Sequence, residues 1–221
     1  MLLWQLDLPE IEFFTSNITA YNNNVIVFGF NEYPFHSKIT IEPDGTKTVV
    51  GNIEFIRGLS NIFVDESLGI FATHGSLYWL TKLNSTGQVV WSTLYDDQIQ
   101  GLGLEKINAF IKDDQGNIFV TGHFPGDDSA NSSDIYLDFL TLKLNSDGEI
   151  IWENKYNRSI DSGEEAFDLA LKNGYIYVCS ESSNDGIGTD HDFVVLKMNA
   201  LNGEETTQYI LTTHRNPKNR V

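Results

Sequence analysis

The sequence predicts an all-β protein, specifically a β-propeller built from about four four-stranded blades. Short runs of strong β-formers alternate with Gly, Asn and Asp along the chain, which is typical of strands joined by hairpins. One pattern of four such runs recurs four times, and tandem four-stranded units are the blades of a propeller. No window shows the sustained helical spacing of apolar residues that would indicate a helix.

The clearest marker of the repeat is a polar hairpin turn that follows an alternating run and ends in glycine. The four turn glycines are Gly45, Gly87, Gly148 and Gly203. Their separations are unequal, as expected when the loops on one side of each unit vary in length. A β-rich run precedes each turn, and these runs begin at Val25, Ile70, Ile118 and Tyr175. Each unit therefore contains four strands, which are named A to D in chain order.

The repeat boundaries follow from these markers. We predict blade 1 at about 11–50, blade 2 at about 57–95, blade 3 at about 107–156 and blade 4 at about 165–211, followed by a polar tail at 213–221. Trp91 and Trp152 occupy equivalent places in strand D, where we expect them to pack between blades. Trp4 lies in a similar run, so residues 2–8 are predicted to be an extra outer strand. Either that strand completes the last blade and closes the ring, or the chain is part of a larger propeller. The sequence slightly favours the larger propeller.

Composition restricts the partners. The chain has 14 basic and 31 acidic side chains and a net charge of −17. Such a surface repels phosphate backbones, so we expect no nucleic-acid partner. No run approaches the ~18 apolar residues of a membrane helix, so no membrane insertion is expected. The start of the chain lacks the basic and apolar regions of a signal peptide. Cys179, the only cysteine, lies in a strand-like run and is expected to pack as a small hydrophobic residue.

Blades 3 and 4 carry a family resemblance. The run Asp114–Gly122, in which strand B ends at the glycine, and the run Asp138–Gly148 resemble bacterial propeller repeats of the SBBP type and delta-60 repeats. The run Asp192–Asn199 is similar to the same repeats. The resemblance covers blades 3 and 4 well, blade 2 moderately and blade 1 poorly. It implies a propeller, commonly in exported bacterial surface proteins, and no particular activity. We therefore expect an extracellular or cell-surface location in a bacterium.

Two connections between strands B and C are long and acidic, and adjacent blades should bring them together. Their carboxylates form the candidate ligand-binding face: Asp127, Asp128, Asp134, Asp185, Asp190 and Asp192. Carboxylate, amide and carbonyl oxygens suit calcium, which is therefore a candidate ion. However, the spacing matches no EF-hand loop, and Asp, Asn, Ser and Gly are also the usual residues of surface loops. No other cofactor is expected.

Each blade also has one histidine in or beside its B–C connection: His36, His74, His123 and His191. A ring of imidazoles could hold a transition metal for lyase or hydrolase chemistry. Ligands around an axis should recur at equivalent positions, and these histidines do not. Loop histidines that are solvated or locally hydrogen-bonded are the simpler interpretation.

The leading functional hypothesis is a non-catalytic scaffold that recognises a protein or a glycan through the B–C face of blades 3 and 4. It depends on strong repeat structure without a constellation of catalytic residues: the sequence contains no phosphate-binding glycine loop, zinc-ligand spacing or nucleophile elbow. The alternative is a metal-dependent lyase or hydrolase that uses the four histidines.

Overall fold

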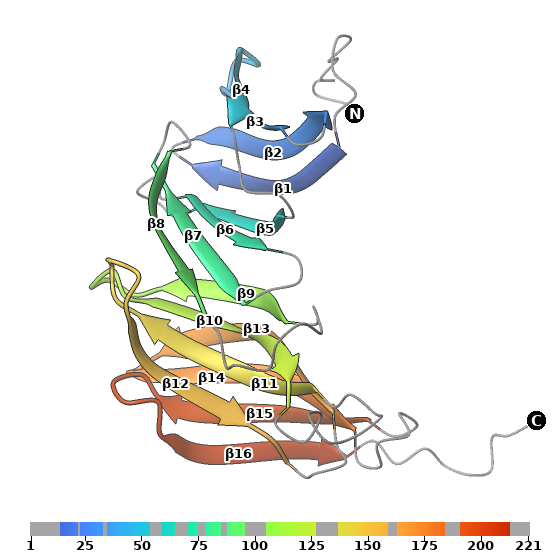
Figure 1. Ribbon diagram of the computed structural model, residues 1–221, viewed down its shortest axis with the longest axis vertical. Helices are drawn as coiled ribbons and strands as arrows, with labels where there is room; N and C mark the ends of the chain where they lie inside the picture. The colour runs from blue at the N-terminus through green and yellow to red at the C-terminus, as the bar shows by residue number, and fades with distance from the viewer. Residues whose placement is uncertain are drawn as a thin grey trace, which may run out of the picture. The chain divides into compact units, whose positions relative to one another are not determined.

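The structure, a computed structural model, describes residues 14–21, 23–32, 35–53, 59–64, 70–74, 78–84, 88–95, 105–126, 137–158, 163–183 and 191–212. Within these residues every regular element is a β-strand. The strands form four four-stranded sheets in the orders β1-β2-β3-β4, β5-β6-β7-β8, β9-β10-β11-β12 and β13-β14-β15-β16. Every neighbouring pair is antiparallel, so each sheet is an up-and-down meander, the blade of a propeller. The predicted fold class is confirmed (Figure 1).

The four sheets, called blades 1 to 4, have the following bounds. Blade 1 consists of β1 (Phe14–Tyr21), β2 (Asn24–Glu32), β3 (Phe35–Ile41) and β4 (Lys47–Ile53). Blade 2 consists of β5 (Leu59–Val64), β6 (Ile70–His74), β7 (Trp79–Leu83) and β8 (Val89–Leu94). Blade 3 consists of β9 (Lys106–Lys112), β10 (Ile118–Pro125), β11 (Leu137–Leu144) and β12 (Ile150–Tyr156). Blade 4 consists of β13 (Glu164–Lys172), β14 (Tyr175–Ser183), β15 (His191–Asn199) and β16 (Glu205–Thr212).

The chain divides into two compact units. The first contains Met1–Gly75 and Trp79–Leu94, and therefore blades 1 and 2; the second contains Ser76–Tyr78 and Tyr95–Val221, and therefore blades 3 and 4. The predicted extra strand at 2–8 and the predicted tail at 213–221 lie outside the described residues. No helix long and apolar enough to span a membrane occurs in the part of the chain that the structure describes.

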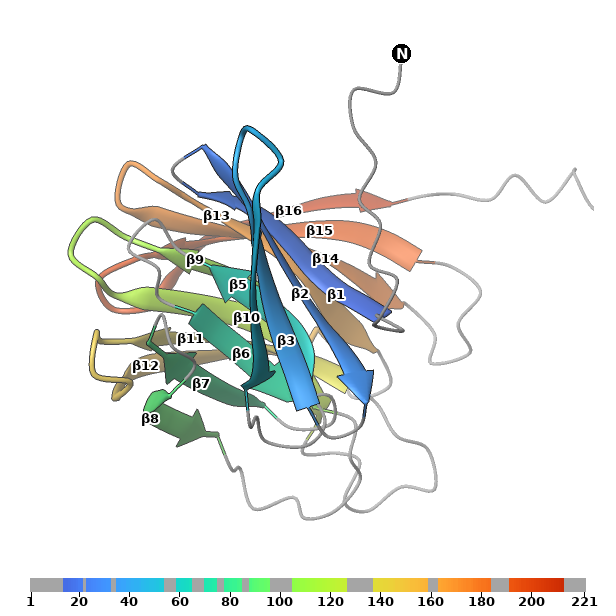
Figure 2. The same cartoon turned by 90° about the horizontal axis from the view of Figure 1, so that it is seen from above.

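Glycine and asparagine determine the hairpin turns. Gly45, Gly116, Gly148 and Gly203 have φ between 74° and 86°, a left-handed conformation that glycine adopts without a Cβ clash. Asn173 and Gly174 both have positive φ, as a two-residue type I′ hairpin requires. In the second unit the A–B and C–D turns lie together at one end of the sheets (Figure 2). The B–C and D–A connections therefore leave and enter the strands at the opposite end.

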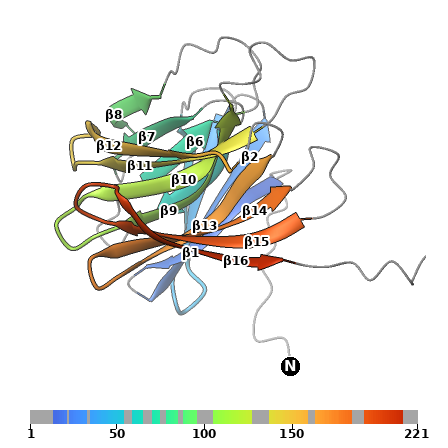
Figure 3. The same ribbon diagram turned by 90° about the horizontal axis from the view of Figure 1, so that it is seen from below.

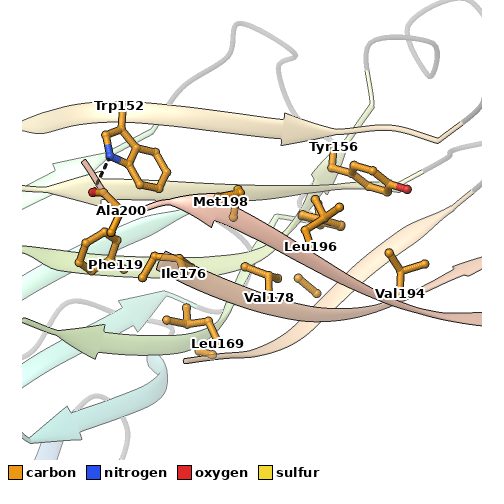
Figure 4. Close-up of a cluster of buried hydrophobic side chains, with 13 residues drawn as sticks. Phe119, Trp152, Tyr156, Leu169, Ile176, Val178, Val194, Leu196, Met198 and Ala200 are labelled. Carbon is orange, nitrogen blue, oxygen red and sulfur yellow. Dashed lines mark hydrogen bonds between the residues drawn. The ribbon is translucent and has the colours of Figure 1, made fainter. Parts of the chain in front are cut away.

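Blades 3 and 4 pack face to face through one apolar core (Figure 4). Blade 3 contributes Ala109, Phe119, Phe139, Trp152 and Tyr156. Blade 4 contributes Ala166, Leu169, Ile176, Val178, Val194, Leu196, Met198 and Ala200. Alternation along the strands places these side chains on facing sheet surfaces, because successive residues of a strand point to opposite faces. Their removal from water is the main force that joins the two blades.

Tryptophan in strand D occupies the same cross-strand position in blades 2 and 3. Trp91 lies 6.0 Å from the Phe71 ring, and Trp152 lies 5.9 Å from the Phe119 ring. A lysine of strand C lies over each phenylalanine: Lys143 Nζ is 5.2 Å from the Phe119 centroid. The expectation that Trp152 packs between blades is confirmed, since it is buried in the core of the second unit.

Replacing Trp152 with phenylalanine is expected to lower the free energy of unfolding by about 1–2 kcal/mol. The change removes part of a buried ring and the hydrogen bond that Trp152 Nε1 donates to Ala200 O over 3.3 Å. Urea denaturation followed by far-ultraviolet circular dichroism measures the effect. The neighbouring Ile151 is 48% exposed, so Ile151→Ala is the matched control and should cost less. An equal loss in both variants would contradict the assignment.

Candidate functional site

The candidate site is the end of the second unit where the B–C and D–A connections meet the strands. The strand ends and starts of blades 3 and 4 gather at this end, opposite the hairpin turns (Figure 3). The common core of the two blades holds these strand ends in place. The two long B–C connections, 126–136 in blade 3 and 184–190 in blade 4, therefore begin and end on neighbouring sheets of one packed unit.

Strand B of blade 3 extends further toward this end than the sequence indicated. The predicted strand ended at Gly122, but β10 continues to Pro125 and pairs residue for residue with β11. A β-bulge between Thr121 and Gly122 shifts the register to β9 at that point. The extension brings His123 into the sheet, where sequence analysis expected it in a connection. The predicted site residue His123 is thus a strand residue.

An aspartate is the second residue of strand C in both blades, and both aspartates are buried. Asp138 is 4% exposed and Asp192 is 1% exposed. The Asp138 carboxylate lies against Gly126, where an added Cβ would come within 2.8 Å of both carboxylate oxygens. Arg158 Nη1, from the D–A connection, donates to Asp192 Oδ2 over 2.6 Å. Asp192 therefore lies beneath the face as an ion-pair partner, because its side chain is almost entirely removed from solvent.

A second pair of polar groups lies between strands A and B of blade 4. Ser182 Oγ donates to Glu164 Oε1 over 3.0 Å, and both side chains are fully buried. Tyr156 stacks on Phe139 with ring centroids 4.7 Å apart, and Gln208 Nε2 donates to its hydroxyl. Burial, followed by the nearby Glu164 charge, raises the pKa of Tyr156 to about 12. Tyr156 is therefore a neutral phenol at physiological pH, and Ser182 has no access to solvent.

His123 connects the two blades at the same end. Its Nδ1 lies 3.2 Å from Glu165 Oε1 in blade 4. Asn108 Nδ2 lies 3.5 Å from the same nitrogen but only 2.8 Å from Ala166 O. The two N–H groups of Asn108 can donate to Ala166 O and, over 3.4 Å, to Glu165 Oε1. We therefore assign the Nδ1 proton of His123 to a bond donated to Glu165. Burial lowers the pKa of His123 and outweighs the opposing effect of the Glu165 charge.

Acidification is expected to destabilise the second unit through His123. Because the folded pKa lies below the unfolded value of about 6.5, the unfolded state takes up the proton first as the pH falls. The stability contributed by neutral His123 is therefore complete above pH ~6.5 and decreases as the pH falls toward the folded pKa. Urea midpoints at pH 7.5, 6.5 and 5.5 should fall less for His123→Gln than for the wild type; an equal or steeper fall in the variant would contradict this.

The remaining predicted site residues are located as follows. Asp127, Asp128, Asp134, Asp185 and Asp190 lie outside the described residues. His36 lies in β3, His74 is the last residue of β6 and His191 is the first residue of β15. His36 and His191 were expected just before strand C and are part of it. His36 and His74 belong to the first unit, and His123 and His191 belong to the second.

Metal binding and catalysis depend on groupings of reactive side chains. Over the described ranges, no group of three or more His, Cys, Asp or Glu side chains could hold a metal ion. Calcium in the acidic connections stays a prediction, since those residues are not described. Burial, with a contribution from Asp168, raises the pKa of the Cys179 thiol. A raised pKa keeps sulfur in the weakly nucleophilic thiol form.

A cleft of about 600 Å³ lies at the opposite, hairpin-turn end of the second unit. Its lining includes Leu171, Leu201 and the side chains of Lys112, Lys143 and Lys172. Lys143 Nζ donates to Ala200 O over 2.9 Å and is nearly buried. This cleft involves none of the residues that sequence analysis proposed as a site.

Sequence reasoning missed the buried polar groups Asp138, Glu164 and Ser182, and the partly exposed Arg158 that pairs with Asp192. The available signal was the repeated Asp-Phe pair at 138–139 and 192–193, which recurs at the start of strand C in both blades. A charged residue that starts an otherwise apolar strand in successive repeats indicates a shared structural position. The partner Arg158 carries no such signal, because it lies in a connection.

No protein-family model and no curated protein matches the chain. Among solved structures, the chain is similar to a protein of unknown function from Bacteroides caccae, at 12% identity and a TM-score of 0.45, over 94% of this chain and 85% of that one. It is similar to a streptogramin B lyase at 11% identity and a TM-score of 0.49, over 88% and 68%. The WD40 domain of SCAP from fission yeast matches at 11% identity and a TM-score of 0.39, over 96% and 54%. Likeness at this level assigns neither a family nor an activity.

Proposed function

We propose that the protein is a non-catalytic recognition scaffold that binds a protein or a glycan on the B–C face of blades 3 and 4. The observation that carries the proposal is the pair of buried aspartates at the start of β11 and β15. Each stands where a long B–C connection returns to its sheet. Buried carboxylates are costly unless they are paired or hydrogen-bonded. Their presence at this register in both blades supports a built platform at the ends of these strands.

The chemistry of the platform supports binding more than catalysis. Three pairs of groups described at this face are engaged with each other: Arg158 with Asp192, Ser182 with Glu164 and His123 with Glu165. Such pairs hold strand ends in a fixed arrangement. The B–C connections that join these strands are rich in Asp, Asn, Ser and Gly. Carboxylates attract basic protein surfaces, and carboxylate and amide oxygens also accept hydrogen bonds from sugar hydroxyls.

The test removes negative charge from the B–C connections and leaves the buried residues Asp138 and Asp192 unchanged. Asp127→Asn, Asp128→Asn and Asp190→Asn are combined in one variant, and binding is measured to a panel of cationic peptides and to an immobilised panel of neutral glycans. Binding that weakens at least about tenfold in the variant supports the proposal. Asp147→Asn is the control, since Asp147 is exposed in the C–D turn at the other end. The proposal fails if neither panel binds or if the variant binds as well as the wild type.

The two ligand classes differ in salt dependence. Binding to a cationic peptide should weaken between about 50 and 500 mM salt, because screening shortens the range of charge attraction. Binding to a neutral glycan should change little over the same range. A salt-independent signal would assign the face to glycan recognition.

A further inference from the structure

The cleft at the hairpin-turn end of the second unit is formed by blades 3 and 4 alone. All of its lining residues lie between Ile111 and Leu201, within that unit. Its volume of about 600 Å³ falls within the roughly 300–1,000 Å³ of small-ligand pockets. The walls are the A–B turns of both blades and the C–D turn of blade 4. Two of these turns are joined by the hydrogen bond that Ala200 N donates to Gly174 O over 2.9 Å.

Lys143 of β11 places a buried positive charge in the lining of this cleft. The residue is only 7% exposed. Its ammonium group donates to Ala200 O over 2.9 Å and lies 5.2 Å from the Phe119 ring centroid. Among the residues that the structure describes, no carboxylate forms an ion pair with Lys143. An ammonium group has three N–H donors, and a buried charge is costly unless it is paired. An anion in the cleft would therefore be stabilised.

The equivalent lysines of the neighbouring repeats lack this setting. Lys82, Lys143 and Lys197 each lie over an aromatic ring of strand B, with Nζ 5.9, 5.2 and 3.9 Å from the ring centroid. Lys82 and Lys197 are partly exposed, so water compensates their charge. Lys143 is the member of the three that lines the cleft and that a blade 4 carbonyl holds. The contact with the ring explains a lysine in strand C, but it does not explain why Lys143 is buried beside a cavity.

The other charged groups of the cleft leave its lining net positive. The charged lining residues are Lys112, Lys143, Lys172, Asp113 and Asp114. The Asp113 carboxylate accepts hydrogen bonds from the backbone N–H groups of Gln115 and Asn117 over 2.9 and 2.8 Å, so it is engaged within its own turn. Asp114 is exposed at the tip of that turn. Three lysines against two aspartates contrast with the net charge of −17 of the whole chain.

Apolar side chains complete the lining, among them Ile111 and Leu171, which also pack against the core of blades 3 and 4. An apolar wall beside a buried cation fits a ligand that has both an anionic group and a hydrocarbon body. We propose that the cleft binds a small organic acid whose carboxylate pairs with Lys143 and whose hydrocarbon body packs against Ile111 and Leu171. The inference does not depend on the proposed function, since the B–C face lies at the other end of the sheets.

Isothermal titration calorimetry of the whole chain with naphthoate tests the proposal. Naphthoate should bind with a dissociation constant below about 1 mM at about 50 mM salt. Neutral naphthalenemethanol has the same ring system without the charge and should bind at least about tenfold more weakly. Inorganic phosphate has charge without a hydrocarbon body and should also bind at least about tenfold more weakly. Absence of naphthoate binding, as when another part of the chain fills the cleft, or equal binding of the three probes would overturn the proposal.

Replacing Lys143 with methionine separates this site from binding elsewhere on the chain. Methionine keeps a long apolar side chain over Phe119, and Ala200 O keeps the hydrogen bond from Trp152 Nε1 over 3.3 Å (Figure 4). The fold should therefore be retained, which circular dichroism checks. The variant should bind naphthoate at least about tenfold more weakly and naphthalenemethanol as the wild type does.

Lys197→Met is the matched control, because Lys197 has the equivalent place in blade 4 and does not line the cleft. It removes the same charge from the chain and should leave naphthoate binding unchanged. Naphthoate binding that survives Lys143→Met, or that weakens equally in both variants, would assign the anion to another place and overturn the proposal. The comparison of the three probes on the wild type needs no variant, so it decides the question even where Lys143→Met is unstable.

Discussion

Replacing Gly122 with alanine is expected to lower the free energy of unfolding of the second unit by about 3–5 kcal/mol. The reason is space and not backbone conformation. A Cβ at this position would lie 1.8 Å from the carbonyl oxygen of Lys106 and 3.0 Å from Cα of Ile107. Both atoms belong to the backbone of β9, so no rotamer change can relieve the contact. The alanine must push β9 away from β10 where the bulge shifts their register.

Urea denaturation of the two proteins measures this loss. Gly116→Ala is the matched control within the same unit: Gly116 has φ +84°, but an added Cβ would only touch Ser146 Cβ at 3.7 Å. Its expected cost is therefore the left-handed strain alone, about 1–2 kcal/mol. The structural account of Gly122 would be wrong if the two substitutions cost the same. Because β9 and β10 both pack in or beside the core of blades 3 and 4, near-ultraviolet circular dichroism should also change.

Replacing Arg158 with alanine is expected to cost about 3 kcal/mol of unfolding free energy. The substitution leaves the Asp192 carboxylate, which is 1% exposed, without the guanidinium that lies 2.6 Å away. A buried carboxylate that loses its cation also loses the compensation for its desolvation. Asp192→Asn should cost less, because the Arg158 side chain is 27% exposed and can be hydrated when its partner is neutral.

A double-mutant cycle checks this asymmetry. With Arg158→Ala and Asp192→Asn combined, the loss should be smaller than the sum of the two single losses, since the buried charge that lost Arg158 is then absent. Lys172→Ala serves as the control for removal of a cation from an exposed position, and its effect should stay within about 0.5 kcal/mol. Strict additivity in the cycle would contradict the ion pair.

The repeat architecture could be predicted from the sequence because hairpin geometry is local. Turns such as Asn145–Gly148 and Asn173–Gly174 have positive-φ glycines at positions that only a few residue types tolerate. Alternation between them specifies which side chains share a face, since the strand period is two. Trp152 could therefore be predicted to pack between blades from its place in strand D.

The candidate site was only partly predictable. Strand order alone determines that the B–C connections of blades 3 and 4 start and end at one end of their sheets, and the use of that end for binding stays a prediction. The role of Asp192 was not predictable in the same way. From the sequence, an acidic residue beside an acidic loop is interpreted as part of that loop. Asp192 is a buried ion-pair partner because Arg158, 34 residues away in sequence, approaches it from a D–A connection.

Sequence alone determined the class of fold, the four repeats and the face on which long connections emerge, because turn chemistry and strand alternation act over a few residues. Only the tertiary structure decided which side chains are removed from water. Phe139 and Phe193 occupy the same register after the same aspartate, yet one is fully buried and the other is 45% exposed. The difference arises because blade 4 covers the first and no described part of the second unit covers the second. Burial is a property of neighbours that are distant in sequence, and periodicity within one strand does not specify them.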